Sequence, residues 1–329
     1  MKIQAKIKQR IIRLALKYPR VTDFVLAPFI YVSGRLLRFI RREGIVNFPR
    51  AKNILMNLGV FPIFNHYYEP RFDNRDPKYP FSQDRILPGI DWNITGQLAL
   101  LDTFTFSEEL LHVPETRPET LEFFMNNATF GSGDAEYWYQ LIRSIQPGKI
   151  YEIGSGNSTL MAIKALRKNR ETDPGYECRH VCIEPYEMPW LEQTGVTVIR
   201  RRVEDIELDF FYELDENDIL FIDSSHIIKP QGDVLFEYLS LLPSLKKGVI
   251  VHVHDIFSPK DYPKKWLEGE VKFWNEQYLL EAFLSHNKSW KIIGALNYLK
   301  HNHYDRIQSI APFITPSREP GSFYIQKIL

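Results

Sequence analysis

The stretch YEIGSGNSTL, residues 151–160, constrains the fold of this 329-residue chain more than any other part of it. An apolar run ends at a glutamate, two glycines alternate with small polar residues, and a helix-like segment follows. Backbone without side chains, at the point where a strand turns into a helix, lets a ligand approach closely. The stretch therefore predicts a strand, a ligand-binding turn and a helix.

From Asp134 onward, strand-like and helix-like segments alternate, which is typical of a parallel sheet with helices on both faces. We expect seven strands within the segments KIYEIGSG, RHVCIEP, VTVIRR, DILFIDSS, GVIVHVHDI, WKIIGALNYL and GSFYIQKIL. No long helix is expected between the last two, so these should pair antiparallel. The predicted fold class is α/β: a Rossmann-like seven-stranded sheet, mostly parallel with the last strand antiparallel, and with an irregular or helical N-terminal extension.

Two carboxylates identify the kind of ligand. Glu152 closes the first strand, and Glu184 ends the next strand 32 positions later. A carboxylate repels a pyrophosphate and attracts an ammonium or sulfonium group, and the second one is placed to accept hydrogen bonds from a ribose diol. Thr159 stands where a dinucleotide-binding turn has its third glycine. These residues favour a cationic nucleoside, and S-adenosylmethionine fits.

EIGSGNS resembles the first motif of the class I S-adenosylmethionine-dependent methyltransferases, with Ser158 in place of the third glycine, and CIEP resembles their second motif. The resemblance implies that RRVED, after the third strand, lies against the adenine. The antiparallel hairpin formed by the last two strands is also expected of this family. The cofactor-binding residues expected on this basis are Glu152, Gly154, Ser155, Gly156, Ser158, Glu184, Val203, Glu204 and Asp223.

A second polar group follows the fourth and fifth predicted strands. Asp223 and His226 lie in FIDSSH, and His254 and Asp255 end GVIVHVHD. The carboxyl ends of parallel strands meet at one edge of a sheet, so these four side chains should share a mouth with the cofactor. Alternation along the strand places His252 one step deeper and buried.

Three interpretations of this group are open from the sequence. In the first, Asp223 and Asp255, together with His254, bind a hard divalent cation such as Mg²⁺, and His226 is the general base. In the second, no metal binds and His226 or His254 is the only base. In the third, all four are hydrogen-bonded structural residues at strand ends.

DSSH and the acidic end of the fifth strand resemble the metal-dependent sugar O-methyltransferases and, more distantly, the catechol O-methyltransferases. This resemblance covers about residues 130–329 and implies Asp223 and Asp255 as metal ligands and His226 as the base. His254 stands where that family has a glutamate, and its imidazole either favours a softer metal or is free for base work.

The resemblance implies methylation of a hydroxyl on a sugar-containing acceptor: a polysaccharide, a glycolipid or a glycosylated natural product. Two alternatives are a metal-independent small-molecule methyltransferase and an inactive, cofactor-binding scaffold protein at a membrane. The joint presence of Asp223, His226 and Asp255 favours catalysis over the scaffold.

Composition predicts three regions: a basic amphipathic helical segment at 1–45, a covering or substrate-recognition region at 46–130, and the methyltransferase domain at 131–329. The middle region is rich in Pro, Asn and aromatic residues, with one helix expected near 95–106. Aromatic faces beside polar groups suit a sugar ring, although ordinary irregular packing explains them equally well. The candidate acceptor contacts are His66, Tyr67, Tyr68, Arg71 and Tyr262.

Basic residues are concentrated at the N-terminus. Before residue 43 the only acid is Asp23, against eleven lysines and arginines, whereas the whole chain carries 41 residues of each sign. One helical face there is apolar, and it carries Ile3, Ile7, Ile11, Leu14 and Tyr18. Residues 1–42 either pack on the domain or on a second subunit of a homo-oligomer, or make peripheral contact with an anionic membrane surface.

Net charge, apolar runs and cysteine content indicate which kinds of partner and compartment to expect. The balanced charge gives no field for nucleic acid, and no run of about 18 uncharged apolar residues predicts a transmembrane helix. The two cysteines, Cys178 and Cys182, fall in one predicted strand, where they would not pair, as suits a reducing cytosol. We expect a cytoplasmic enzyme with a small-molecule or glycan acceptor, at the membrane periphery if residues 1–42 bind lipid.

Overall fold

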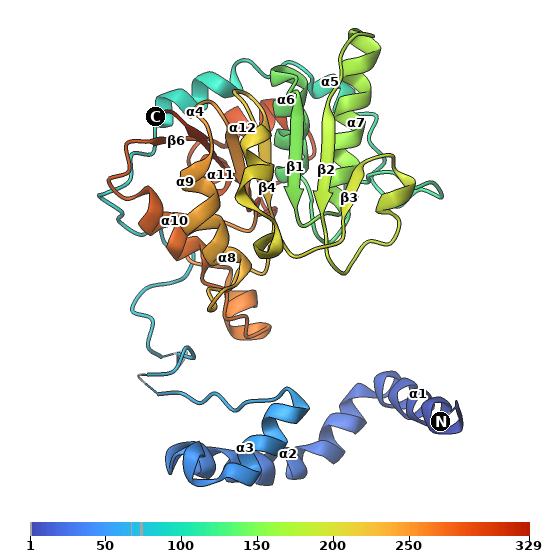
Figure 1. The fold of residues 1–329 in the computed structure, drawn as a ribbon, viewed down its shortest axis with the longest axis vertical. Coiled ribbons are helices and arrows are strands. Elements are labelled where there is room, and N and C mark those ends of the chain that lie inside the picture. Colours follow the sequence, from blue (N-terminus) through green and yellow to red (C-terminus); the bar gives the residue numbers. More distant parts are fainter. Residues whose placement is uncertain (1, 67, 73–74) are drawn as a thin grey trace. The chain divides into compact units, whose positions relative to one another are not determined.

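The computed structural model describes residues 2–66, 68–72 and 75–329, with side chains described from residue 9 onward except residue 11. The chain forms two compact units, Met1–Pro77 and Lys78–Leu329, each with its own set of helices (Figure 1). All strands of the described residues lie in the larger unit.

The larger unit is built on one seven-stranded sheet with the order β3-β2-β1-β4-β5-β7-β6. Its strands are β1 (Lys149–Ile153), β2 (Arg179–Ile183), β3 (Thr197–Ile199), β4 (Ile219–Ile222), β5 (Ile250–Val253), β6 (Trp290–Ala295) and β7 (Phe323–Lys327). Strands β1 to β5 pair in parallel, and Figure 1 shows β4, β1, β2 and β3 side by side. Strand β7 is antiparallel to both β5 and β6. The predicted fold class is confirmed.

The antiparallel pairing of β6 with β7 was expected because no long helix would separate them. Two short helices do lie between them, α11 (Leu296–Asn302) and α12 (Tyr304–Ile310). The run WKIIGALNYL is apolar both before and after Ala295, so its hydropathy does not show where the strand ends and the helix begins. Buried Leu296 and Leu299 continue the core from a helix instead of from a strand.

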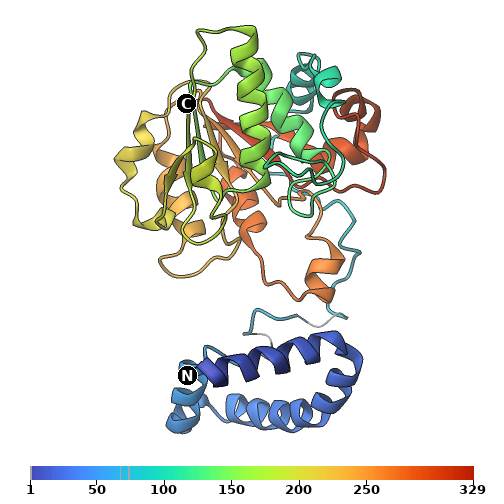
Figure 2. The same ribbon diagram turned by 90° about the vertical axis from the view of Figure 1, so that its right-hand side faces the viewer.

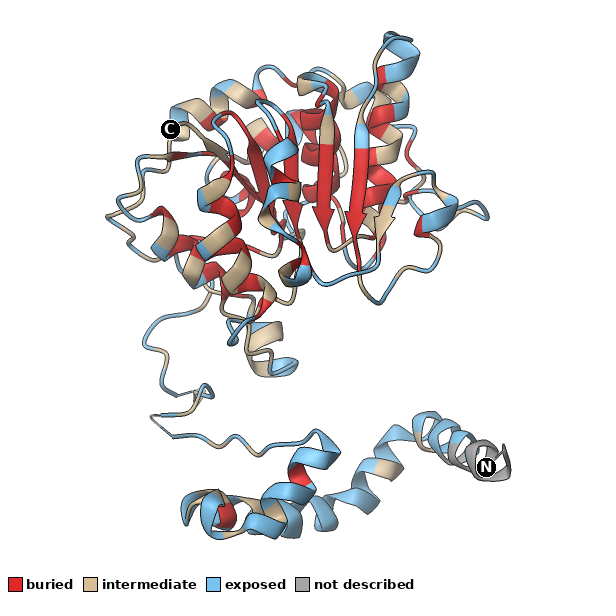
Figure 3. Ribbon diagram, viewed as in Figure 1, coloured by how far each residue is buried: buried red, intermediate tan, exposed pale blue. Residues whose placement is uncertain are grey.

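Helices cover both faces of the sheet, as Figure 2 shows. On one face α6 (Asp134–Ile145), α7 (Asn157–Thr172), α11 and α12 pack on strand residues such as Ile150 and Phe221. On the other face the helical segment 233–244 and α10 (Glu276–Leu284) pack on the alternate residues, such as Tyr151 and Leu220. The central strands are consequently buried on both sides (Figure 3), as their near-continuous apolar sequences require.

The segment 78–130 belongs to the same compact unit as the sheet. It carries two short helices, α4 (Ile94–Leu101) and α5 (Ser107–Leu110), in place of the one helix expected near 95–106. Its side chains Phe104, Leu110 and Phe123 are buried in the same apolar cluster as those of α6. The compact unit therefore begins at Lys78, because this segment supplies part of the core.

An ionic network ties that segment to the helices. Arg143 of α6 is 4% exposed and donates to both oxygens of Glu109 in α5, at 2.8 and 2.9 Å, and to Asn169 of α7. Burial would raise the pKa of Glu109, but the bonds from Arg143 and Tyr139 lower it. Charge-assisted bidentate pairing of this kind is strong when one partner is buried.

The smaller unit contains α1 (Lys2–Lys17), α2 (Pro19–Arg42), the short helical turn Ile45–Asn47 and α3 (Pro49–Leu58). Ile3, Ile7 and Ile11, which belong to the predicted apolar face, have side chains outside the described set. Leu14 and Tyr18, from the same face, are 62% and 51% exposed. None of the helices in the described part of the chain is long and apolar enough to cross a bilayer.

Replacing Arg143 by alanine should destabilise the larger unit by about 3 kcal/mol, because it leaves the carboxylate of Glu109 and the amide of Asn169 without their partner. Urea denaturation followed by circular dichroism measures the loss. Lys168→Ala is the matched control, since its ion pair with Glu171 lies on the surface of α7, and its midpoint should equal that of the parent. Equal midpoints for all three proteins would contradict the structural role of Arg143.

Candidate functional site

The turn after β1 requires a glycine. Gly154 has φ +78°, and a Cβ atom there would lie 2.0 Å from the carbonyl oxygen of Asp223, which ends β4. The Gly154 N–H donates to the Ile183 carbonyl at 3.0 Å, and the Asp223 N–H donates to the Ile153 carbonyl at 2.8 Å. Strands β1, β2 and β4 therefore end at the same edge of the sheet. The strand order reverses between β1 and β4, because β2 and β3 follow on one side of β1 and β4 and β5 on the other. Open α/β sheets bind their ligands at this point.

A cavity of about 630 Å³ lies at this edge. Eight of the nine predicted cofactor residues line it: Gly154, Ser155, Gly156, Ser158, Glu184, Val203, Glu204 and Asp223. The sequence did not single out several other residues of its wall, among them Thr129, Phe130, Met188, Arg202, Lys229 and Asp233. Residues 129 and 130 reach the wall from the segment that the sequence analysis assigned to the covering region.

Glu184 is fixed in the cavity wall at the end of β2. One of its carboxylate oxygens accepts hydrogen bonds from the backbone N–H groups of Tyr186 and Glu187, at 3.0 and 2.9 Å. The chain after the strand thus folds back around the carboxylate and sets its direction. Glu204, further along the wall, lies 3.5 Å from Arg202.

Glu152 does not line the cavity. Its side chain is fully buried, and one oxygen accepts hydrogen bonds from the hydroxyls of Ser158 and Thr159 at 2.8 and 3.0 Å. The other oxygen contacts Nε2 of His180 in β2. The sequence placed this carboxylate beside a bound cation; in this structure strand alternation directs it under the start of α7, where it contacts that helix and β2.

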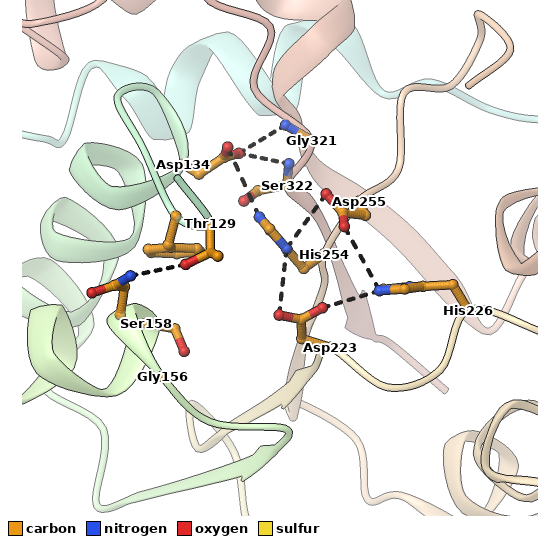
Figure 4. A network of polar contacts seen from close by, with 12 residues as sticks. Thr129, Asp134, Gly156, Ser158, Asp223, His226, His254, Asp255, Gly321 and Ser322 are labelled. Atoms are coloured by element: carbon orange, nitrogen blue, oxygen red, sulfur yellow. Dashed lines mark hydrogen bonds and ion pairs between the residues drawn. The ribbon is translucent and has the colours of Figure 1, made fainter. Parts of the chain in front are cut away.

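The second polar group does come together (Figure 4). His226 Nε2 lies 3.2 Å from one oxygen of Asp223 and 3.7 Å from one of Asp255. His254 Nδ1 lies 3.6 Å from the other oxygen of each carboxylate. Asp223 also lines the cavity, so it joins this acid–histidine cluster to the ligand site.

Two members of the cluster have a left-handed backbone. His226 and Asp255 both have φ +59°, a conformation that non-glycine residues adopt rarely and at a cost. Hydrogen bonds hold the chain there: the backbone N–H groups of Asn275 and Glu276 donate to the carbonyl of His226 at 2.9 and 3.2 Å. Such local cost is common at functional sites, because it aims side chains that regular strand geometry would direct elsewhere.

Glu276 and Trp274 surround the ring of His226, and the sequence analysis missed both. Nδ1 of His226 donates to a carboxylate oxygen of the fully buried Glu276 at 2.8 Å, and the other oxygen accepts a bond from Tyr238 at 3.1 Å. The Trp274 ring packs on the imidazole with 4.2 Å between centroids. Nδ1 is thereby committed to Glu276, and Nε2 faces Asp223 and Asp255.

Asp134, the first residue of α6, is the third acidic neighbour of His254, after Asp223 and Asp255. One of its oxygens accepts the backbone N–H groups of Gly321 and Ser322 at 2.9 and 2.7 Å, and the other lies 3.9 Å from His254 Nε2. The sequence showed an acid at a predicted helix start, a common position that carries no sign of a site.

The charges of the cluster depend on one another. Burial would raise the pKa of Asp223, but His254 and His226 hold it well below its usual range. Burial would lower the pKa of His226, but Asp223 and Glu276 raise it to about 10. Asp255 and Asp223 likewise raise the pKa of His254 against the effect of burial. Burial raises the pKa of Asp255 in spite of His254. His252 is buried as expected, and burial lowers its pKa.

The geometry allows a metal ion at one corner of this cluster. Asp223, His226 and Asp255 offer ligand atoms that all lie within 4.8 Å of one another. The expected set contained His254 in place of His226, and the structure does not group His254 with them. His254 Nδ1 is nevertheless buried, has no hydrogen-bond partner and faces the same two carboxylates. Two carboxylates and an imidazole form a donor set that a divalent ion can use.

The predicted acceptor contacts fall in both units of the chain. Tyr262 is 1% exposed, and its hydroxyl accepts the backbone N–H of Gln277 at 3.0 Å, so in this structure it is packed within the larger unit. His66, Tyr68 and Arg71 belong to the smaller unit, and Tyr67 lies outside the described residues.

Residues 151–256 match a family model described as a methyltransferase domain. An uncharacterised protein of Archaeoglobus fulgidus is 30% identical over 182 residues, which cover 51% of this chain and 80% of that protein.

Among solved structures, CalS11, a TDP-rhamnose 3'-O-methyltransferase of calicheamicin biosynthesis, is 15% identical with a TM-score of 0.35, covering 59% of this chain and 78% of that one. The plantazolicin methyltransferase BpumL, solved with S-adenosylhomocysteine (SAH), is 13% identical with a TM-score of 0.34, covering 60% and 84%. MycE of mycinamycin biosynthesis, solved with Mg and SAH, is 12% identical with a TM-score of 0.31, covering 58% and 48%.

The contact between His180 and Glu152 should make stability depend on pH. Burial would lower the pKa of His180, but Cys182 and Glu152 raise it from 6.5 to about 10. A raised histidine pKa stabilises the fold fully below about pH 6.5 and progressively less as the pH rises toward 10. The difference in free energy of unfolding between the parent and His180→Gln should therefore shrink by a few kcal/mol over this range.

Urea denaturation of both proteins at a series of pH values measures that difference. His112→Gln, which replaces an exposed histidine, is the control and should follow the parent at every pH. A difference between the parent and His180→Gln that stays constant across the range would contradict the ionic contact.

Proposed function

We propose that the chain is a class I S-adenosylmethionine-dependent methyltransferase and that it transfers the methyl group to a hydroxyl oxygen of a sugar-containing acceptor; the methyltransferase-domain match over residues 151–256 and the seven-stranded sheet support this. One observation carries the proposal: Asp223 is both a wall residue of the ligand cavity and a member of the acid–histidine cluster. A reacting hydroxyl placed beside Asp223 would therefore lie within reach of a base and of the cofactor together.

The cavity suits the cofactor in both size and chemistry. Glu184 and Glu204 present carboxylates that can accept hydrogen bonds from ribose hydroxyls or from the adenine amine, and Gly154 and Gly156 leave the backbone open between them. S-adenosylmethionine supplies a methyl group already activated by its sulfonium charge. The protein has to align the acceptor oxygen with that group and exclude water.

His226 is the proposed general base. Glu276 holds Nδ1, so Nε2 is the nitrogen that faces Asp223 and Asp255, and Asp223 lines the cavity. The acceptor hydroxyl would give its proton to Nε2 as its oxygen takes the methyl group. Base catalysis by a positioned side chain typically contributes about 10²–10⁴-fold to the rate.

Asp223 and Asp255 are the proposed ligands of a divalent cation, with Mg²⁺ the expected ion for carboxylate oxygens. When bound, such an ion would orient two acceptor oxygens, lower the pKa of the reacting one and neutralise the carboxylates that hold a proton on His226. His254, behind these two residues, is the proposed additional ligand or second base.

Metal-independent methyl transfer is the second candidate, and one observation favours it. His254 Nδ1 already lies 3.6 Å from both Asp223 and Asp255, so an imidazolium there can balance their charge without a metal. With His254 charged, His226 would act alone as the base; His254 could act alone only in its neutral form. An inactive scaffold protein is a third candidate, which requires that the cofactor binds but no acceptor is methylated.

The sugar-containing acceptor rests on the motif similarity of DSSH and the end of β5, and a glycan, a glycolipid or a glycosylated small molecule all satisfy it. We place the enzyme in the cytoplasm, with residues 1–42 at a membrane periphery. Its cysteines, Cys178 and Cys182, are free thiols, as a reducing compartment permits. The acidic mouth gives no support to a nucleic-acid acceptor.

Calorimetric titration with SAH, the demethylated product, tests the ligand. The parent should bind it, and Gly154→Ala should not, because the new Cβ would collide with the Asp223 carbonyl. Gly269→Ala is the control, since a Cβ there meets only Lys265 at 3.9 Å. Glu184→Gln should bind about 10–100-fold more weakly, which gives a measurement that does not depend on how Gly154→Ala folds. Heat with a dinucleotide but none with SAH would refute the cofactor assignment.

Methyl transfer from labelled cofactor to a panel of glycosides tests the base and the metal. His226→Ala should lower kcat by about 10²–10⁴-fold, while His112→Ala, at an exposed position, should leave it unchanged. Exhaustive chelation should abolish turnover and added Mg²⁺ should restore it, and Asp255→Asn should weaken Mn²⁺ binding measured by electron paramagnetic resonance.

Full turnover by His226→Ala would show that this residue is not the base. Turnover that survives chelation, together with a large loss in His226→Ala, would support the metal-independent candidate. Cofactor binding without methylation of any glycoside would leave the scaffold as the better account.

A further inference from the structure

Helix α2 exposes a long apolar surface. Residues 24–32, FVLAPFIYV, contain no charged side chain, and Phe24, Phe29 and Ile30 are 81%, 68% and 66% exposed. These positions point in different directions around the helix, so the apolar surface is not one narrow stripe. Figure 3 shows α2 exposed along most of its length. Soluble domains rarely expose a continuous surface of this kind without a partner for it.

The smaller unit does not bury this surface itself. Among its described side chains only Ile40 and Leu55 are buried. Between residues 12 and 39 the exposed large apolar side chains are Ile12, Leu14, Leu16, Tyr18, Val21, Phe24, Val25, Leu26, Phe29, Ile30, Tyr31, Val32, Leu36 and Phe39. Adjacent helices α1 and α2 thus place their apolar side chains in solvent together.

Positive charge borders the apolar run on both sides. Lys17 and Arg20 precede it, and Arg35, Arg38 and Arg42 follow it. The last three line a shallow cavity of about 270 Å³ together with Phe39. Arg42 pairs with Glu43, whereas Arg35 and Arg38 form no ion pair within the part of the chain that the structure describes. Three guanidinium groups around a hollow beside an aromatic ring match an anionic phosphate group.

We propose that residues 18–42 bind the surface of an anionic lipid bilayer, with the run 24–32 in the boundary between headgroups and acyl chains and the arginines on lipid phosphates. The charge pattern selects this occupant. A second copy would bring eleven basic residues and one acid against an identical surface, and like charges would repel. Basic side chains beside an exposed apolar helix are what interfacial membrane helices use.

The length of the apolar run 24–32 indicates how deeply α2 can enter a bilayer. Nine helical residues extend about 14 Å at 1.5 Å each, about half of the roughly 30 Å hydrocarbon core. Arginines follow within one turn of the run, so α2 is an interfacial helix and not a spanning one. This proposal does not depend on methyl transfer, because it concerns the smaller unit alone.

Co-sedimentation of the full chain with vesicles tests the proposal. The parent should bind vesicles of phosphatidylcholine mixed with phosphatidylglycerol much more tightly than phosphatidylcholine alone, and salt should weaken the binding. Arg35→Gln/Arg38→Gln should lower the affinity for the anionic vesicles about 30-fold. Phe29→Ser/Ile30→Ser should lower it by at least about tenfold.

Matched controls come from the larger unit. Lys264→Gln/Lys265→Gln removes two exposed charges, and Ile86→Ser removes an apolar side chain that is 92% exposed. Both should bind vesicles like the parent. SAH titration of every variant shows whether the larger unit is intact, so a failure of the cofactor assignment and a failure of the membrane proposal are distinguished.

Hydrogen exchange on the parent gives a measurement without substitutions. Anionic vesicles should slow amide exchange within residues 18–42 and leave the larger unit unchanged. No binding, equal binding to neutral and anionic vesicles, or protection confined to residues 78–329 would overturn the proposal. So would a dimer in sedimentation velocity that Phe29→Ser/Ile30→Ser dissociates while vesicle binding stays unchanged, because the apolar run would then serve a second copy.

Discussion

The close approach of β1 and β4 at their carboxyl ends sets the position of everything else in the larger unit. The chain can turn at residue 154 only because glycine has no Cβ to meet the carbonyl of Asp223. That contact fixes two things at once. It opens the backbone of the turn toward the cavity, and it places the Asp223 side chain at the border between the cavity and the histidines. A bulkier turn would separate the nucleoside site from the proton-accepting site, although each could still fold.

In the acid–histidine cluster next to the cavity, opposite charges of neighbouring side chains balance one another. Asp134, Asp223, Asp255 and Glu276 surround two imidazoles, and charged neighbours shift the pKa values of Asp223, His226 and His254 away from their usual ranges. Isolated buried charges are costly, so the arrangement is stable only when positive and negative groups occupy it together. A divalent ion and a protonated histidine are two ways to meet the same requirement. This is why one set of side chains accommodates both the metal-dependent and the metal-independent candidates.

The sequence predicted those parts of the fold that are encoded locally. Five parallel strands lie within the expected segments, because apolar runs and glycine turns report backbone structure directly. It did not predict Glu276, which approaches His226 from 50 positions away along the chain. It also placed Glu152 at the ligand, because a strand pattern gives alternation but not which face a later helix will cover. The two helices between β6 and β7 were not predicted for a related reason: a short run of apolar residues is compatible with a strand and with a helix.

Helix α10 controls the proposed base through two separate attachments. Its first residue binds the imidazole ring, and the N–H groups at its start hold the carbonyl of the same histidine. Ring and backbone therefore travel with the helix as one body. Substitutions on the outward side of α10, which touch neither cavity nor cluster, can still alter the angle at which the imidazole meets its target. Substitutions on that outer side could thus change the reactivity of the proposed base through the orientation of its ring, while every reacting group stays the same.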